Sequence, residues 1–215
     1  MTYLELVNAV LRRLRVTVVS TVNENSYSSM IGDLVNDSKS TVESAWDWSA
    51  LRTTLSVATG SDIFNYALTG SQNSIKLLDV INDTSNVFMT YRPSTWMNNV
   101  FLNSEPATGS PLYYSFNGVN DNGDTLVDLY PIPDGVYDLR FNSILRTPDL
   151  VEDTDVLIVP SRPVIHDALA VAARERGETG GTSTAEYFSM ANNYLSDAIA
   201  LDANRHPEEL IFRVI

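Results

Sequence analysis

The sequence SYSSMIGDLVNDSKSTVESAWDW, which runs from Ser26 to Trp48, determines the architecture that we predict for this chain. At spacings of three and four, its apolar residues fall on one helical face and its polar residues on the other. The apolar face comprises Tyr27, Met30, Ile31, Leu34, Val35, Val42, Ala45 and Trp46. The polar face comprises Ser29, Asp33, Asn36, Asp37, Lys39, Ser40, Glu43 and Asp47. The segment is therefore predicted to form an amphipathic helix that is too polar to cross a membrane.

The apolar pattern changes after Trp48, where alternation begins, with Leu51, Thr53, Leu55 and Val57 on one side of an extended chain. Helix-like sequence precedes this point, and helix-like sequence returns near the C-terminus. We therefore predict an α+β fold, in which a helical bundle is built from both chain ends and an antiparallel β-sandwich or barrel domain is inserted between them. The expected boundaries are 1–52 and 160–204 for the helical domain, 53–159 for the β domain and 205–215 for a C-terminal interaction tail.

The N-terminal helix is predicted to begin with a capping box, in which Thr2 caps the helix and Glu5 reaches back. Its end carries Arg12, Arg13 and Arg15. Basic residues in a last turn compensate the helix dipole, which is the simplest interpretation of this cluster. Contact with an acidic partner or with nucleic acid is the alternative that the sequence leaves open.

Short alternating runs separated by turn residues characterise the region between Leu55 and about Pro160, and they predict an all-β unit. Asn122-Gly123 predicts a hairpin whose two central residues both take positive φ. Pro131 to Gly135 predicts another turn, with Gly135 in the left-handed conformation. A strand-like run extends from Ile75 to Ile81. The alternating sets are Phe64, Tyr66 and Leu68; Val87, Met89 and Tyr91; Leu112, Tyr114 and Phe116; and Tyr137, Leu139 and Phe141.

The C-terminal helical region is predicted to begin at Ser161, as a capping residue, with Pro163 in the first turn. Gly177 is expected to end this helix, and Ser183 and Glu186 form a second capping box. The buried face of the first of these helices is expected to comprise Val164, Ile165, Ala168, Leu169, Ala172 and Ala173.

The composition limits the classes of function. The 215 residues are 44% hydrophobic and 19% charged, which is typical of a folded globular protein, and there is no cysteine. We expect no secretory signal and no membrane association. The formal net charge is −13, with only 14 Lys and Arg, which disfavours a protein that grips a phosphate backbone. An acidic wall would instead let DNA slide past without binding it.

No motif in the sequence predicts catalysis, a metal or a cofactor. His166 and His206 lie on different elements, and His166 is best explained as a structural histidine. The loop from Gly118 to Asp124 resembles a calcium loop only superficially, because Gly118 and Leu129 would occupy positions that need carboxylates. The chain is therefore expected not to be an enzyme.

Two further groups of residues have structural interpretations. Asp153 and Asp155 are expected to be solvated in a loop. Trp46, Trp48 and Trp96 could form a sugar-stacking set, but Trp46 and Trp48 are expected to pack in the core or at the domain junction.

The apolar C-terminus does call for a function. Its apolar residues are Leu210, Ile211, Phe212, Val214 and Ile215. Such a terminus either folds back on its own domain or binds another chain, often by adding a strand to an open sheet edge, and we favour the partner.

The order of several motifs resembles the head-to-tail adaptor of short-tailed bacteriophages, the tail tubular protein A type. The motifs are Trp46-x-Trp48, the threonine-rich strand from Thr53 to Gly60, Tyr66-Ala67-Leu68, the segment from Gly109 to Tyr114, the segment from Leu129 to Leu139, Asp149-Leu150, Val159-Pro160 and the alanine-rich helix from Asp167 to Arg174. The likeness covers nearly the whole chain except the stretch from Thr69 to Leu102.

The resemblance implies a structural virion protein that forms a ring, usually of twelve subunits, between the portal and the tail nozzle. It implies that DNA passes through the centre without specific binding, and that the protein is made in the host cytoplasm and resides in the virion neck. Tail fibres are a further candidate partner. The residues expected to contact partners are the apolar tail and Arg12, Arg13 and Arg15. The alternatives are a tail-associated carbohydrate-binding or hydrolytic component and a ring protein of some other filament.

Overall fold

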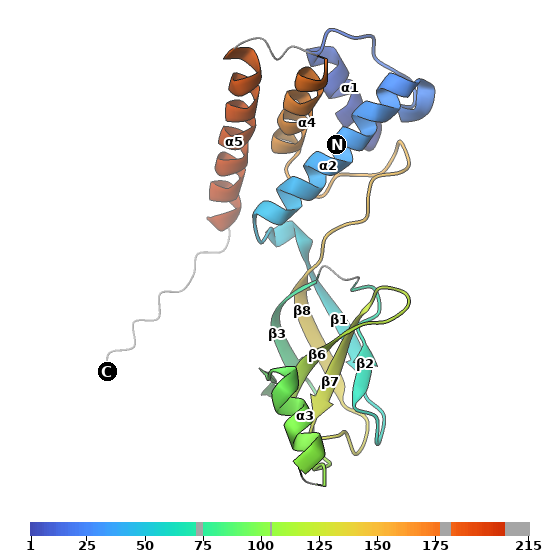
Figure 1. Cartoon of the computed structure of the whole chain (residues 1–215), viewed down its shortest axis with the longest axis vertical. Coiled ribbons are helices and arrows are strands. Elements are labelled where there is room, and N and C mark those ends of the chain that lie inside the picture. The colour runs from blue at the N-terminus through green and yellow to red at the C-terminus, as the bar shows by residue number, and fades with distance from the viewer. Residues whose placement is uncertain (72–74, 104, 177–181, 205–215) are drawn as a thin grey trace, which may run out of the picture. The chain divides into compact units, whose positions relative to one another are not determined.

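The chain forms two compact units (Figure 1). The computed structural model describes residues 1–71, 75–103, 105–176 and 182–204. One unit combines Met1–Leu51 with the chain from Thr147 onward, and the other consists of Arg52–Arg146. The predicted α+β fold, with helices from both chain ends and β structure between them, is confirmed.

The helical unit is organised around α4 (Ser161–Glu175), which contacts α1 (Tyr3–Arg13), α2 (Ser26–Ala45) and α5 (Thr182–Ala203). Short 3₁₀ turns, η1 (Val22–Glu24) and η2 (Ser49–Leu51), complete the unit. All six apolar residues expected on the inner face of α4 are buried, and Ala170 is buried as well. Alanines allow close approach of neighbouring helices, so one helix can pack against three others. No helix within the described residues is long and apolar enough to span a bilayer.

The ends of the helices only partly follow the sequence prediction. The capping box of α1 is present, with Glu5 N–H donating to Thr2 Oγ1 over 3.3 Å and Thr2 N–H donating to Glu5 Oε2 over 2.9 Å. Ser161, by contrast, lies inside α4, whose N-cap is Pro160, without a side-chain cap. The proposed capping role of Ser161 was therefore wrong.

The polar face predicted for α2 contains two buried charges. Lys39 and Glu43 are 1% and 4% exposed, whereas Trp46, assigned to the apolar face, is 37% exposed. Lys39 Nζ lies 3.3 Å from Glu43 Oε1 and donates to the carbonyl of Thr147 over 2.8 Å. The segment that begins at Thr147 covers this side of the helix, so the two charges neutralise each other out of water.

The β unit consists of two four-stranded sheets. The first has the order β1 (Arg52–Ala58), β8 (Asp138–Ile144), β3 (Lys76–Asn82) and β4 (Val87–Phe88). The second has the order β2 (Asn65–Ala67), β7 (Thr125–Tyr130), β6 (Tyr113–Val119) and β5 (Thr90–Tyr91). Neighbouring strands are antiparallel except β5 and β6, which are parallel.

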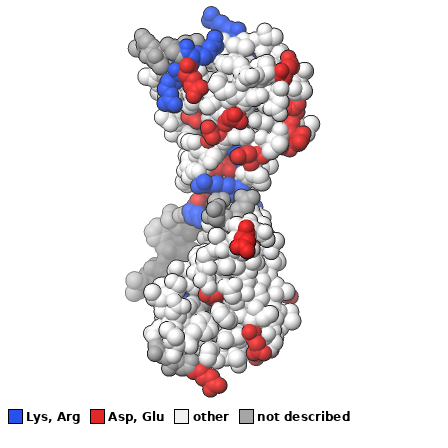
Figure 2. All heavy atoms as spheres, turned by 45° about the vertical axis from the view of Figure 1, so that its right-hand side comes forward, with Lys and Arg blue, Asp and Glu red and all other residues white. Residues whose placement is uncertain are grey.

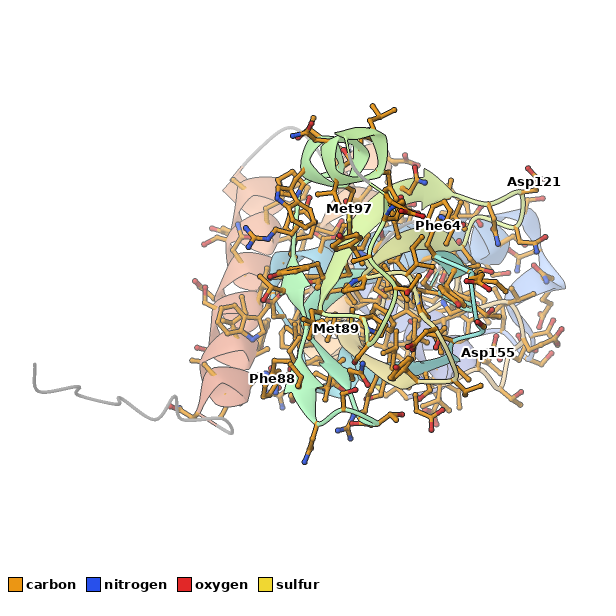
Figure 3. All side chains as sticks on the ribbon, turned by 90° about the horizontal axis from the view of Figure 1, so that it is seen from below. Phe64, Phe88, Met89, Met97, Asp121 and Asp155 are labelled. Carbon is orange, nitrogen blue, oxygen red and sulfur yellow. The ribbon has the colours of Figure 1, made fainter. Side chains whose placement is uncertain are left out.

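The core of the β unit includes residues from both sheets. Met89 is buried where the chain passes from β4 in one sheet to β5 in the other (Figure 3). The buried set comprises Leu68, Val80, Met89, Tyr114, Val127, Leu129, Leu139 and Phe141. The alternating pattern read from the sequence correctly identified most of these inward positions.

The β unit also contains a helix, α3 (Ser94–Asn103), which the sequence did not predict. The expectation of an all-β unit was therefore wrong. The backbone N–H groups of Trp96 and Met97 donate to the carbonyl of Pro93, and the Met97 side chain is 1% exposed (Figure 3). Trp96, Met97, Val100 and Phe101 have the spacing of one helical face, and contact with β6 stabilises a helix that is too short to be stable alone.

The predicted hairpin between β6 and β7 is present, with a different turn. Gly123 has φ +82°, but Asn122 does not take positive φ. Instead Asn120 Oδ1 accepts the N–H groups of Asn122 and Asp124, over 2.9 and 2.8 Å. This side-chain acceptor stabilises the turn, as is common for Asn, so one left-handed residue suffices. Gly135 likewise does not take positive φ.

The inserted unit ends earlier than the expected boundary at residue 159, because the chain from Thr147 groups with the helices. Asn36 exchanges two hydrogen bonds with the backbone of Leu150, over 3.0 and 2.9 Å. Asp153 Oδ1 accepts the N–H of Val22 over 2.9 Å, and Asp155 Oδ2 accepts two N–H groups of its own loop. These carboxylates stabilise the loop, which corrects their interpretation as simply solvated.

Candidate interaction surfaces

The end of α1 has an unusual backbone at Arg15. The N–H of Val16 donates to the carbonyl of Leu11 over 3.0 Å, and the N–H of Arg15 donates to that of Arg12 over 3.1 Å. This pair of bonds is the Schellman motif, in which the residue at the position of Arg15 takes the left-handed conformation and is usually glycine. Arg15 has φ 57°. An arginine therefore occupies a position where a Cβ is unfavourable.

The side chains of Arg12, Arg13 and Arg15 are all exposed. Arg13 Nη1 donates to the carbonyl of Ala9 over 2.8 Å, as expected for a residue that compensates the helix C-terminus. Arg12 and Arg15 make no side-chain hydrogen bond or ion pair within the part of the chain that the structure describes. Dipole compensation by direct contact therefore accounts for one of the three arginines.

Two further arginines join this surface, Arg174 in α4 and Arg176 at its C-cap, and the sequence analysis did not single them out. Arg176 Nη1 donates to the carbonyl of Leu14 over 3.0 Å, which joins the C-terminal end of α4 to that of α1. Arg174 lies in the last turn of α4, with its guanidinium 5.9 Å from the ring centre of Phe188. We call Arg12, Arg13, Arg15, Arg174 and Arg176 the arginine end. Figure 2 shows basic side chains gathered at one end of the helical unit.

The apolar tail from Leu210 to Ile215 lies outside the described residues, but the helix that precedes it is firmly attached. Asp202 Oδ2 accepts the indole N–H of Trp46 over 3.2 Å and the backbone N–H of Ser49 over 3.0 Å. Asp202 Oδ1 accepts the hydroxyl of Ser49 over 2.5 Å. The C-terminal end of α5 is thus bound to the chain that follows α2.

An apolar groove of about 380 Å³ lies beside this attachment. Leu201 and Ile158 border it and are 68% and 48% exposed. The full lining comprises Trp48, Ala50, Ile158, Val159, Pro160, Ala198, Leu201 and Asp202. Such an apolar surface on a helical unit is typical of a contact site for another segment of chain.

His166 lies in the packing between helices. Its ring is stacked on that of Tyr194, with 4.4 Å between the ring centres, and the side chain is 9% exposed. Burial lowers the pKa of His166, and the charges of Arg13 and Arg162 lower it further. A neutral ring packed on an aromatic ring agrees with the structural role predicted from the sequence.

The remaining candidates for chemistry are separated in the fold. Among the described residues, no three His, Asp or Glu side chains are grouped so that they could hold a metal ion. Trp48 is buried and donates to the carbonyl of Val42 over 2.7 Å, whereas Trp96 belongs to the β unit. The Trp96 ring packs against Tyr113 and Tyr130, with Arg92 at 5.3 Å from its centre, so its neighbours within the fold already use its aromatic surface.

The chain combines a helical unit built from both chain ends with an inserted two-sheet unit, and it exposes charged and apolar surfaces that could contact other chains. The comparison with family models specifies the family: the chain belongs to the SU10 adaptor protein family, whose model matches residues 1–210. This family consists of phage adaptors, and the predicted adaptor identity is thereby confirmed. No curated protein matches the chain.

Proposed function

We propose that this protein forms a ring in the neck of a phage virion, where it joins the portal to the tail nozzle and lines the DNA channel. The observation that carries the proposal is the family match over 210 of the 215 residues, because an adaptor is by definition a protein that connects others. The two-unit fold supports the proposal, since two separate units can face two different partners.

The charge of the chain supports the proposed role as a channel wall. At a formal net charge of −13, the protein repels the DNA backbone at long range. A channel that gripped phosphates would slow the passage of DNA, because each neutralised phosphate adds a favourable contribution to binding. The acidic balance therefore suits DNA that passes through without being held.

The contact with the portal is assigned to the apolar tail and the helical unit. The tail follows α5 in the sequence, and the C-terminal end of α5 is bound through Asp202 to Trp46 and Ser49. Leu210, Ile211, Phe212, Val214 and Ile215 provide apolar area that can be buried against a neighbouring chain, at about 25 cal/mol per Å².

Deletion of Glu208 to Ile215 tests this assignment. Truncated subunits should fold, because the described helices do not include these residues, but should fail to join portals, and particles should lose DNA. A second variant keeps the chain length and replaces the five apolar tail residues with Ser, so it tests the apolar side chains alone and should fail in the same way. If either variant still joins portals and retains DNA normally, the tail is not the contact. Electron microscopy of the protein with and without portal measures the ring and its expected twelve subunits.

A further inference from the structure

The helical unit carries opposite charges at the two ends of α1. The arginine end, defined above, lies at the C-terminal end of α1, and Glu175 is the acidic residue between Arg174 and Arg176. The other end carries the carboxylates of Glu5, Asp33, Asp149, Glu152 and Asp153, which we call the acidic end. A helix of 11 residues separates the two groups by about 16 Å.

The acidic end is placed by contacts to Tyr3, the first residue of α1. The N–H groups of Tyr3 and Leu4 donate to the carbonyls of Asp155 and Asp153, over 2.8 and 3.2 Å, so this loop borders the N-terminus of the helix. Burial raises the pKa of the Tyr3 hydroxyl to about 12, and the negative charges of Asp33, Asp149 and Asp153 contribute to the shift. Tyr3 therefore lies near three of the five carboxylates of the acidic end.

The backbone at Arg15 indicates that the arginine end has a role beyond stability. Glycine would satisfy the left-handed position more favourably, yet the chain has an arginine whose side chain is exposed and makes no hydrogen bond or ion pair with the described residues. Strain at a non-glycine residue that the local fold does not require is typical of functional positions.

We propose that the arginine end of one copy binds the acidic end of the next copy. This inference rests on the proposed ring and identifies its subunit contact. Two different surfaces on one chain produce a head-to-tail interface, which closes into a ring when the rotation between copies allows it. The charge of −13 opposes binding of DNA to the five arginines, whereas a neighbouring copy offers five carboxylates at one place. Charges farther apart than about 8–10 Å are screened at physiological salt, so the local attraction decides the contact.

Self-association of the full chain tests the proposal. In sedimentation velocity, the wild type should form oligomers larger than dimers at about 50 mM salt and dissociate at about 500 mM, because screening weakens charge pairs. Arg15→Glu should weaken association at least about tenfold, in keeping with measured couplings of close charge pairs. Arg146→Glu, the same charge change at an exposed site in the β unit, should alter it less than about twofold.

A charge swap gives the sharpest version of the test. The variant Arg12→Glu/Arg15→Glu and the variant Asp33→Lys/Asp149→Lys should each stay monomeric, and an equimolar mixture should associate, because each reversed end then meets its complement. Asp33 and Asp149 are exposed and make no side-chain hydrogen bond among the described residues, so their replacement leaves the fold intact. Monomers in the mixture would overturn the proposal.

Arg15→Gly separates binding from folding. Glycine relieves the left-handed strain, so the melting temperature should rise by about 2–4 °C while association weakens. An unchanged association constant would contradict the proposal.

Three other results would overturn the proposal. They are a wild type that is monomeric at both salt concentrations, one that stops at a closed dimer, and one that binds duplex DNA through these arginines instead of self-associating. If such a chain still joins portals, the adaptor function stands and only the subunit contact fails. If it joins no portal either, both proposals fail.

Discussion

The two units are held together in different ways. In the helical unit, polar side chains connect segments that lie more than a hundred residues apart in the sequence: Lys39 and Glu43 bond to Thr147, Asn36 to Leu150, and Asp202 to Trp46 and Ser49. In the β unit, an apolar core is shared by two sheets, and polar side chains bond across neighbouring strands, as Asn142 does with Thr54 and Asp79.

The difference follows from how each unit uses the chain. The β unit is one continuous segment, and backbone ladders align its strands even where they are far apart in sequence, as in the pairing of β1 with β8. The helical unit consists of two segments separated by the inserted unit, and its apolar faces alone do not determine how the returning chain meets α2. Hydrogen bonds have defined directions, so the buried polar contacts determine this alignment.

The largest expected effect comes from removing one half of the buried ion pair. Lys39→Met leaves Glu43 charged and out of water, and it should lower the free energy of unfolding of the helical unit by about 3–5 kcal/mol. In a Trp96→Phe background, both remaining tryptophans report on this unit, so denaturant unfolding followed by tryptophan fluorescence measures the loss.

The double variant Lys39→Met/Glu43→Leu is the control for charge. It removes both partners, so most of the stability lost in Lys39→Met should return. The recovery should be incomplete, because the N–H and hydroxyl groups of Thr147 lose their acceptor Glu43. A loss below about 1 kcal/mol in Lys39→Met would mean that the helical unit does not depend on this contact.

A medium effect is expected from adding a methyl group to a glycine in each unit. At Gly32 in α2, a Cβ would overlap the hydroxyl of Tyr3 and approach Val22 Cγ1 to 2.9 Å, so Gly32→Ala should destabilise by about 2 kcal/mol. At Gly135 in the β unit, nothing lies within 4 Å, and Gly135→Ala should change stability by less than about 0.5 kcal/mol. Equal melting temperatures for the two variants would contradict close packing of α1 on α2.

The smallest effect is a pH dependence confined to the helical unit. The pKa of His166 is lowered from its ordinary value of 6.5, first by burial and then by Arg13 and Arg162, so the fold favours the neutral ring. Below about pH 6.5 the unfolded chain binds a proton more readily than the folded one, and stability decreases as the pH falls toward the folded pKa.

His166→Phe keeps a ring against Tyr194 and removes the proton site. Its stability, compared with that of the wild type by urea unfolding at pH 7.5 and 5.5, should fall less on acidification. An identical decrease in both proteins would assign the pH dependence to other groups.

Much of the fold could be predicted from local pattern. Apolar spacing of three and four identified α1, α2 and α4, and alternation identified most strands and core residues such as Phe141 and Leu139. Helix α3 was missed although Trp96, Met97, Val100 and Phe101 have helical spacing, because the helix is short and the surrounding strand-like runs favoured an all-β interpretation.

The candidate surfaces were predicted only in part. Arg12, Arg13 and Arg15 were identified as a cluster, but the addition of Arg176 depends on its bond to Leu14, 162 residues away. The left-handed backbone of Arg15 could not be expected either, since glycine is the residue that usually signals this conformation.

The sequence by itself determined the type of most elements and their division between two units, because helical and extended periodicity are properties of neighbouring residues. The tertiary structure alone decided which charges are buried and which are exposed. Lys39 and Glu43 lie on a polar stripe that any isolated helix would turn toward water, and only the returning chain at Thr147 makes their burial favourable. Burial depends on what covers a residue, and the covering segment here comes from the far side of an inserted unit.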